Sequence, residues 1–184
     1  TDSPSATISG TNPKLVDGGV PVRLKVLISL STMALLFARW GACETATVPL
    51  RLSNTTHSLQ VADLGNGVYG GRTTGEDPYV VCEQVTQPFD HERLFVLAFD
   101  YQCPDGLDFV EVFYGSPFHG DNRVVTDAVP AATDWRPFAV NLKTAPRGDW
   151  GPAVIDFRLD FGGGGQHVLK LRNLRLRALT AEEV

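Results

Sequence analysis

Residues 93–114, RLFVLAFDYQCPDGLDFVEVFY, constrain the fold more than any other part of the chain. Residues 94–99 are apolar without a break, Pro104, Asp105 and Gly106 follow as turn formers, and residues 107–114 resume with aromatic and β-branched side chains. This pattern predicts two strands joined as a hairpin. Because the first strand is apolar on both sides, we expect it to be central and covered on both faces. Two packed sheets are the simplest way to cover it.

Short apolar runs separated by turn residues continue through the rest of the chain from Thr47. Their spacing of about 8–12 residues is typical of a sandwich or barrel, and no helix of normal length is expected among them. We therefore predict an all-β, two-sheet antiparallel β-sandwich. The predicted strands are residues 57–63, 67–73, 79–85, 93–101, 107–114, 123–127, 135–143, 154–161 and 167–177.

Alternation along the later strands predicts which side chains face the core. The inward set contains Phe138, Val140, Leu142, Ile155, Phe157, Leu159 and Phe161. Asp156, Arg158 and Asp160 then share the opposite, polar face of their strand. In the last strand, Leu169 and Leu171 are out of phase with Leu174 and Leu176, which predicts a β-bulge at Arg172 and Asn173.

The first 46 residues differ in composition from the rest. Residues 1–21 are rich in Ser, Thr, Gly, Asn and Pro, which predicts a disordered leader. In residues 22–46, Arg23 and Lys25 precede an apolar run at 26–38 and small residues follow, as in a secretory signal peptide. A membrane anchor is the alternative, but the run covers only about 20 Å of a roughly 30 Å hydrocarbon core. We expect a secreted or periplasmic protein with no stable membrane span after cleavage. A translation start near residue 22 is one explanation for a signal peptide that begins this far into the chain. Lipidation at Cys43 is a weaker alternative.

Residues 47–178 form the predicted sandwich domain. In residues 179–184, Thr180 and Glu183 have the spacing of a helix capping box, which predicts the start of a following helix or domain. The net charge is -5 with dispersed basic residues, so we expect no nucleic-acid partner. Cys82 and Cys103 lie on or beside consecutive predicted strands. They are expected either to form a disulfide or to remain as two buried free thiols.

Four segments carry a resemblance to a known family. They are TGEDPYVV at 74–81, Asp134-Trp135, IDFRLDF at 155–161 and KLRNLRL at 170–176. Over about residues 48–178, the chain resembles the carbohydrate-binding-module-like jelly-roll domains of exported bacterial polysaccharide-degrading enzymes. The resemblance implies a jelly-roll sandwich that binds glycans or braces a catalytic neighbour. The family often carries a structural calcium; Asp160 is the one candidate ligand, and no other cofactor is expected.

A sugar ring presents an apolar face and a rim of hydroxyl groups, so a binding site needs an exposed aromatic ring with polar groups beside it. Trp135, Trp150 and Tyr114 are the candidate stacking residues, and Asp156 and Arg158 the candidate polar ones. Each aromatic residue has an alternative role at the rim of the core. Similarly, the polar face formed by Asp156, Arg158 and Asp160 could instead be an ordinary solvated surface with no ligand.

No catalytic constellation is found. Asp156 and Asp160 lie roughly 13 Å apart by strand rise, too far for a glycosidase pair. The leading hypothesis is a non-catalytic accessory module that binds a polysaccharide or oligosaccharide and holds a covalently linked catalytic domain on it. The alternatives are a ligand-free sandwich that packs on that domain, and a small jelly-roll hydrolase or lyase.

Overall fold

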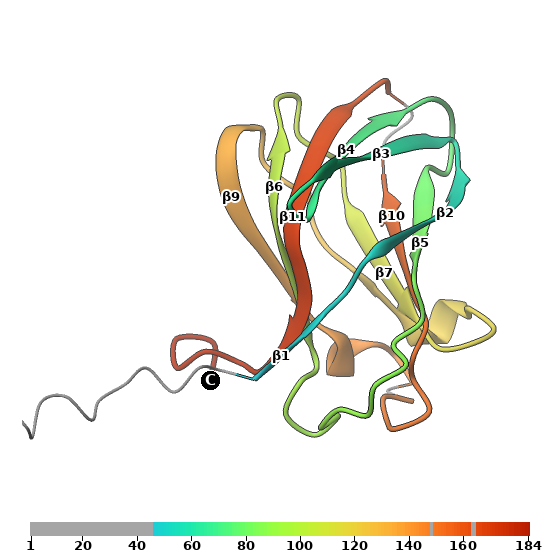
Figure 1. Cartoon of the computed structure of the whole chain (residues 1–184), viewed down its shortest axis with the longest axis vertical. Helices are drawn as coiled ribbons and strands as arrows, with labels where there is room; N and C mark the ends of the chain where they lie inside the picture. The colour runs from blue at the N-terminus through green and yellow to red at the C-terminus, as the bar shows by residue number, and fades with distance from the viewer. Residues whose placement is uncertain (1–45, 148, 163–164) are drawn as a thin grey trace, which may run out of the picture. The chain divides into compact units, whose positions relative to one another are not determined.

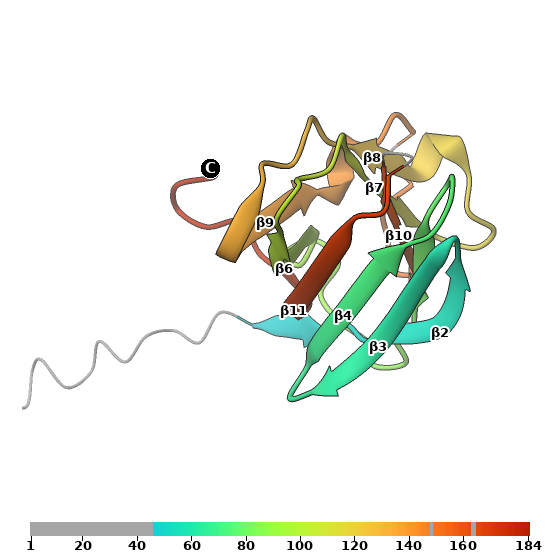
Figure 2. The ribbon, with the colours of Figure 1, turned by 90° about the horizontal axis from the view of Figure 1, so that it is seen from above.

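The computed structural model describes residues 46–147, 149–162 and 165–184. Within these ranges the chain contains two antiparallel sheets and no α-helix, which confirms the predicted two-sheet β-sandwich (Figures 1 and 2). The predicted disordered leader at residues 1–21 lies outside the described ranges. The predicted signal peptide at residues 22–46 does too, except for Ala46. None of the described segments is a helix long and apolar enough to cross a membrane.

The strands divide between the sheets so that neighbours along the chain often lie in different layers. The six-stranded sheet has the order β3 (Leu59–Gly65), β4 (Val68–Thr73), β11 (Val168–Arg177), β6 (Val96–Cys103) and β9 (Ala132–Asn141), with β1 (Thr47–Pro49) also paired to β11. The five-stranded sheet has the order β2 (Leu52–His57), β5 (Tyr79–Cys82), β10 (Phe157–Phe161), β7 (Val110–Tyr114) and β8 (Arg123–Val125).

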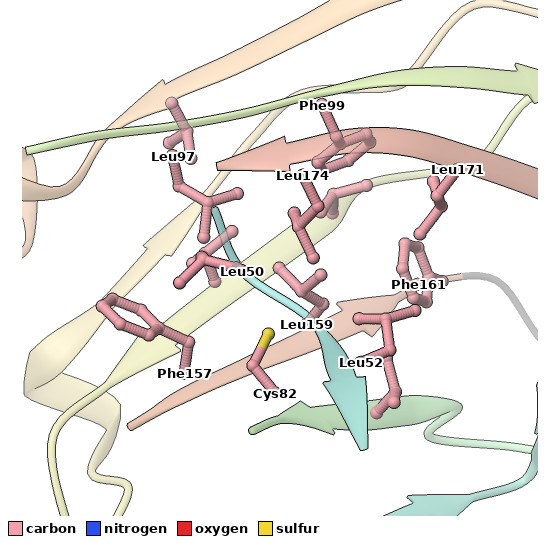
Figure 3. Close-up of a cluster of buried hydrophobic side chains, with 14 of the residues drawn as sticks. Leu50, Leu52, Cys82, Leu97, Phe99, Phe157, Leu159, Phe161, Leu171 and Leu174 are labelled. Atoms are coloured by element: carbon pink, nitrogen blue, oxygen red, sulfur yellow. The ribbon is translucent and has the colours of Figure 1, made fainter. Parts of the chain in front are cut away.

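The core lies between the two sheets, as Figure 3 shows. Leu97, Phe99, Leu171 and Leu174 reach it from the six-stranded sheet, and Cys82, Phe157, Leu159 and Phe161 reach it from the five-stranded sheet. The predicted inward alternation of the last strands is therefore confirmed. Cys82 and Cys103 are both buried and free, one in each sheet.

The predicted hairpin at residues 93–114 is wrong. β6 pairs with β11 and β9, whereas β7 pairs with β10 and β8, so the turn between them carries the chain from one sheet to the other. Gly106 is suited to this crossing because it has a positive φ of 72°, and an added Cβ would lie 2.7 Å from the Val129 carbonyl oxygen. The other expectation for this segment is confirmed: β6 is internal to its sheet, and its outward residues Val96 and Ala98 are also buried.

The predicted β-bulge in the last strand is confirmed. Pairing between β11 and β6 shifts register between Arg172 and Arg175, and Asn173 has a positive φ of 55°. The extra residue restores the inward phase, so that Leu171 and Leu174 both lie in the core.

The bulge also marks the place where β11 changes its neighbour. β4 pairs with residues 168–172 of β11, and β1 pairs with residues 175–177. A groove of about 550 Å³ opens at this seam, lined in part by Arg51, Tyr69 and Asn173.

The start of the sandwich also differs from the prediction. Residues 57–63 are not one strand: β2 ends at His57 and β3 begins at Leu59, with Ser58 between them at a positive φ of 45°. At the other end of the chain, Glu183 accepts a hydrogen bond from the Thr180 backbone N–H at 2.9 Å, in a turn rather than a helix.

Candidate functional site

A row of aromatic and cationic side chains crosses the outer face of the five-stranded sheet, with one residue on each strand. In sheet order it consists of His57, Tyr79, Arg158, Phe113 and Arg123, and we call it the cross-sheet row. The His57 and Tyr79 rings stack with centroids 5.4 Å apart. The Arg158 Cζ lies 3.8 Å from the Tyr79 centroid and 4.9 Å from the Phe113 centroid, and the Arg123 Cζ lies 5.7 Å from the Phe113 centroid. From Tyr79 onward, rings and guanidinium groups thus alternate across the sheet.

Strand alternation places this row on the outside. Phe157 and Leu159 lie in the core, so Arg158 between them points outward. Phe113 lies directly opposite Arg158 on one side and Arg123 on the other. Although Phe113 is only 9% exposed, it does not belong to the core cluster, because the neighbouring arginines cover it from outside.

Carboxylates hold the arginines of the row in position. Both oxygens of Asp160 accept hydrogen bonds from Arg158, one from Nε at 2.7 Å and one from an Nη. Asp77 lies 3.4 Å from the same guanidinium group. Glu111, directly opposite Asp160, pairs with Arg123 at 3.2 Å. Charge-assisted, two-point pairs of the kind between Asp160 and Arg158 fix a planar guanidinium in orientation as well as in place.

Asp160 has an unusual environment for a carboxylate on a sheet face, since the residue is only 3% exposed. Burial raises its pKa to about 6, with the charges of Asp77 and Glu111 adding to the effect and the hydrogen bonds from Arg158 opposing it. The carboxyl group therefore changes charge in a range close to neutral pH.

A hollow of about 130 Å³, which we call the acidic hollow, adjoins the carboxylates that hold the arginines of the row, and Asp77, Glu111 and Asp160 contribute to its lining. The ring of Phe109 also lines it and packs directly on Gly162, where a Cβ would clash with that ring. The hollow combines an aromatic side chain with hydrogen-bond acceptors, which is the combination expected for recognising a ring with a hydroxyl rim.

Comparison with known proteins reveals similarity in structure only. No protein-family model matches the sequence, and no curated protein matches it. A family 29 carbohydrate-binding module superposes with a TM-score of 0.53 at 11% identity, over 76% of this chain and 93% of that one. A mutant family 29 module complexed with cellulohexaose has a TM-score of 0.54 at 11% identity, over 76% and 96%. Another mutant, complexed with mannohexaose, has a TM-score of 0.50 at 11% identity, over 72% and 91%.

This chain has the fold of a carbohydrate-binding module. The β-sandwich resemblance inferred from the sequence is thereby confirmed.

Within this carbohydrate-binding-module fold, the predicted site residues do not converge on one place. Arg158 belongs to the cross-sheet row. Asp156 lies just before β10 and accepts a hydrogen bond from Gln84 Nε2 at 2.8 Å. Trp135 lies on the other sheet, in β9.

Tyr114 and Trp150 pack at the core instead of forming an exposed platform. Tyr114 is fully buried, which corrects the expectation that its ring stacks on a ligand. It meets Trp150 edge to face at a centroid distance of 5.4 Å. The half-buried Trp150 packs against the core and donates from Nε1 to the His91 carbonyl oxygen at 2.7 Å. Trp150 is therefore a residue of the core rim, which was the alternative to its predicted role in stacking on a sugar.

Sequence reasoning missed Phe113, Glu111 and Arg123 as part of a site. A signal was present, because Val110 and Val112 predict an inward phase that includes Tyr114 and turns Glu111 and Phe113 outward. The contact of Tyr79 with Arg158 had no such signal. It depends on the pairing of β5 with β10, which sets Tyr79 opposite Asp160, two residues along the strand from Arg158.

The residues around Asp160 do not fit the structural calcium that the family resemblance implies. Both of its oxygens are engaged by Arg158. In the part of the chain that the structure describes, no group of three or more His, Cys, Asp or Glu side chains is arranged to hold a metal ion.

Proposed function

We propose that this chain is a non-catalytic carbohydrate-binding module that binds a glycan chain on the outer face of its five-stranded sheet. The observation that carries the proposal is the position of Arg158, between the rings of Tyr79 and Phe113 and fixed by both oxygens of Asp160. A guanidinium group held in this way keeps its remaining N–H groups oriented toward a ligand. The exposed carboxylate of Asp77 beside it supplies acceptors for sugar hydroxyl groups.

The fold supports the same proposal. Solved modules of this fold are complexed with cellulohexaose and mannohexaose, so hexasaccharides of these two kinds are the first ligands to test. We further propose that the module is exported and serves a linked catalytic domain as an accessory that keeps it on its polysaccharide.

The geometry favours binding over catalysis. Asp160 and Glu111 lie directly opposite each other on neighbouring strands. A glycosidase also uses two carboxylates that lie close together. However, Asp160 is only 3% exposed, and each carboxylate is engaged by an arginine. A general acid must reach the glycosidic oxygen of its substrate, which Asp160 cannot do from this position.

Isothermal titration calorimetry of residues 1–184 with cellulohexaose and mannohexaose tests the proposal. Tyr79→Ala should weaken binding roughly tenfold or more, because it removes both a ring and the support of Arg158. Trp135→Ala is the matched control, since it removes an aromatic residue from the other sheet. Far-UV circular dichroism confirms that each variant is folded.

Two outcomes would overturn the proposal. If the folded parent binds neither hexasaccharide nor any member of a polysaccharide panel, the sandwich is not a carbohydrate-binding module. If Trp135→Ala abolishes hexasaccharide binding and Tyr79→Ala leaves it intact, the glycan site lies on the other sheet.

A further inference from the structure

The outer face of the six-stranded sheet carries a concentration of positive charge that the cross-sheet row does not explain. Leu169, Leu171, Leu174 and Leu176 of β11 point into the core, so the residues between them point outward. The outward cations of β11 and its neighbour β4 are Arg72, Lys170, Arg172, Arg175 and Arg177. This face is therefore basic in a chain whose net charge is -5.

Only part of this charge is neutralised by acidic side chains. Arg172 Nε donates to Asp100 at 3.0 Å, and Arg177 forms a two-point pair with Glu183 at 2.6 and 2.7 Å. By contrast, among residues 46–147, 149–162 and 165–184, Arg72, Lys170 and Arg175 make no ion pair.

The strand register explains why Lys170 is left without an acidic neighbour. Its two cross-strand partners are Gly70 in β4 and Gln102 in β6. Likewise, Arg175 lies opposite Ala98 and donates to the Asn173 carbonyl oxygen, at 2.6 Å. Neither cation has a carboxylate directly across from it in these strands, so both are available to an anion from outside.

An aromatic side chain on the same face contacts one of its arginines. Trp135 is half-buried, and the Cζ of Arg172 lies 4.3 Å from its ring centroid. Asp100 orients this arginine and also accepts from Asn173 Nδ2 at 2.7 Å. The face thus combines an oriented guanidinium group, a partly exposed ring and three cations without an ion pair among the described residues.

We propose that the outer face of the six-stranded sheet is a second binding face, and that its ligand is an anionic polysaccharide. Carboxylate groups along the polymer pair with Lys170 and Arg175, and one sugar ring packs at Trp135. A membrane surface fits less well because a peripheral helix or apolar patch is needed, and Leu64 and Val168 are isolated exposed apolar residues here. Single-stranded nucleic acid fits less well because it is bound on several successive stacking rings, and among the described residues Trp135 is the single aromatic side chain that stacks on a cation of β11.

The test is affinity gel electrophoresis of the full chain in gels that contain polygalacturonate, with an uncharged mannan gel alongside. The double variant Lys170→Gln with Arg175→Gln should weaken retardation by polygalacturonate roughly tenfold, because two charge pairs are lost. It should leave retardation by mannan unchanged. Retardation of the parent by polygalacturonate should also decrease as salt rises.

Arg93→Gln is the matched control, because Arg93 is an exposed cation in the loop before β6 and makes no ion pair within the described ranges. Three results would overturn this proposal: no retardation of the folded parent by polygalacturonate, an equal loss in the Arg93→Gln control, or tighter binding of single-stranded DNA than of polygalacturonate. The proposal does not depend on the first face. If the double variant still binds mannan, the proposed function is supported, whether or not the parent binds polygalacturonate.

Discussion

Arg158 lies over Tyr79 with its Cζ 3.8 Å from the ring centroid, close enough for the guanidinium plane and the ring to stack. The two residues are on neighbouring strands, β10 and β5, and only the pairing of those strands brings them together. In this contact the Tyr79 ring supports the guanidinium group of Arg158, and the guanidinium group restricts the motion of the ring.

Replacing Arg158 with lysine tests whether planarity matters as well as charge. Arg158→Lys keeps the positive charge but loses the two-point pair with Asp160 and the flat contact with Tyr79. We expect the affinity for mannohexaose to decrease roughly tenfold by calorimetry. Arg93→Lys is the control. An unchanged affinity in Arg158→Lys would show that the guanidinium geometry does not contribute to the site.

The pKa of about 6 at Asp160 predicts that glycan binding depends on pH. Below pH 6 the carboxyl group becomes protonated and accepts less strongly from Arg158, so affinity should decrease as pH falls from about 7 to about 5. Asp160→Asn should bind more weakly and flatten this profile. Asp156→Asn, just before the same strand, should retain it. If affinity depended on pH in the same way in the parent and in Asp160→Asn, the pH dependence could not be due to Asp160.

The same raised pKa has a consequence for stability. Between the ordinary carboxyl pKa of 3.8 and the folded value of about 6, the folded chain binds more protons at Asp160 than the unfolded chain does. The contribution of Asp160 to stability therefore declines as pH rises through this window and is constant above it. Thermal unfolding of the parent relative to Asp160→Asn should show this decline, and a difference that grows with pH would have the wrong sign.

The hydroxyl group of Tyr114 is buried and has no hydrogen-bond partner among the described residues. Tyr114→Phe removes this group without changing the ring that packs on Trp150. We expect the free energy of unfolding to stay the same or increase by up to about 1 kcal/mol, measured by urea denaturation. A loss of more than about 1 kcal/mol would mean that the hydroxyl group is hydrogen-bonded in solution.

Gly162 should tolerate no side chain, because an added Cβ would overlap the ring of Phe109. Gly162→Ala must displace this ring from the lining of the acidic hollow, and we expect destabilisation of about 1–3 kcal/mol by urea denaturation. Gly120→Ala is the control, since a Cβ added at Gly120 would have no atom within 4 Å. Equal stabilities of the two variants would show that Phe109 moves aside without cost.

The sequence by itself determined the class of fold and much of its local detail. Alternation of apolar and polar residues was sufficient to place Phe157 and Leu159 inward and Arg158 outward, because the pleat of a strand has a period of two residues. The change of phase between Leu171 and Leu174 was sufficient to locate the bulge for the same reason. These features depend only on residues near one another along the chain.

Only the tertiary structure decided which strands are neighbours, and with that the candidate site. The turn at Gly106 has the composition of a hairpin turn, yet β6 and β7 pair with distant strands in different sheets. Trp135 and Arg158, both predicted as ligand residues, consequently lie on different sheets, while Tyr79, Arg158 and Phe113 come together from three separate strands. Such contacts depend on how long-range pairing buries the apolar faces, which local sequence patterns do not specify.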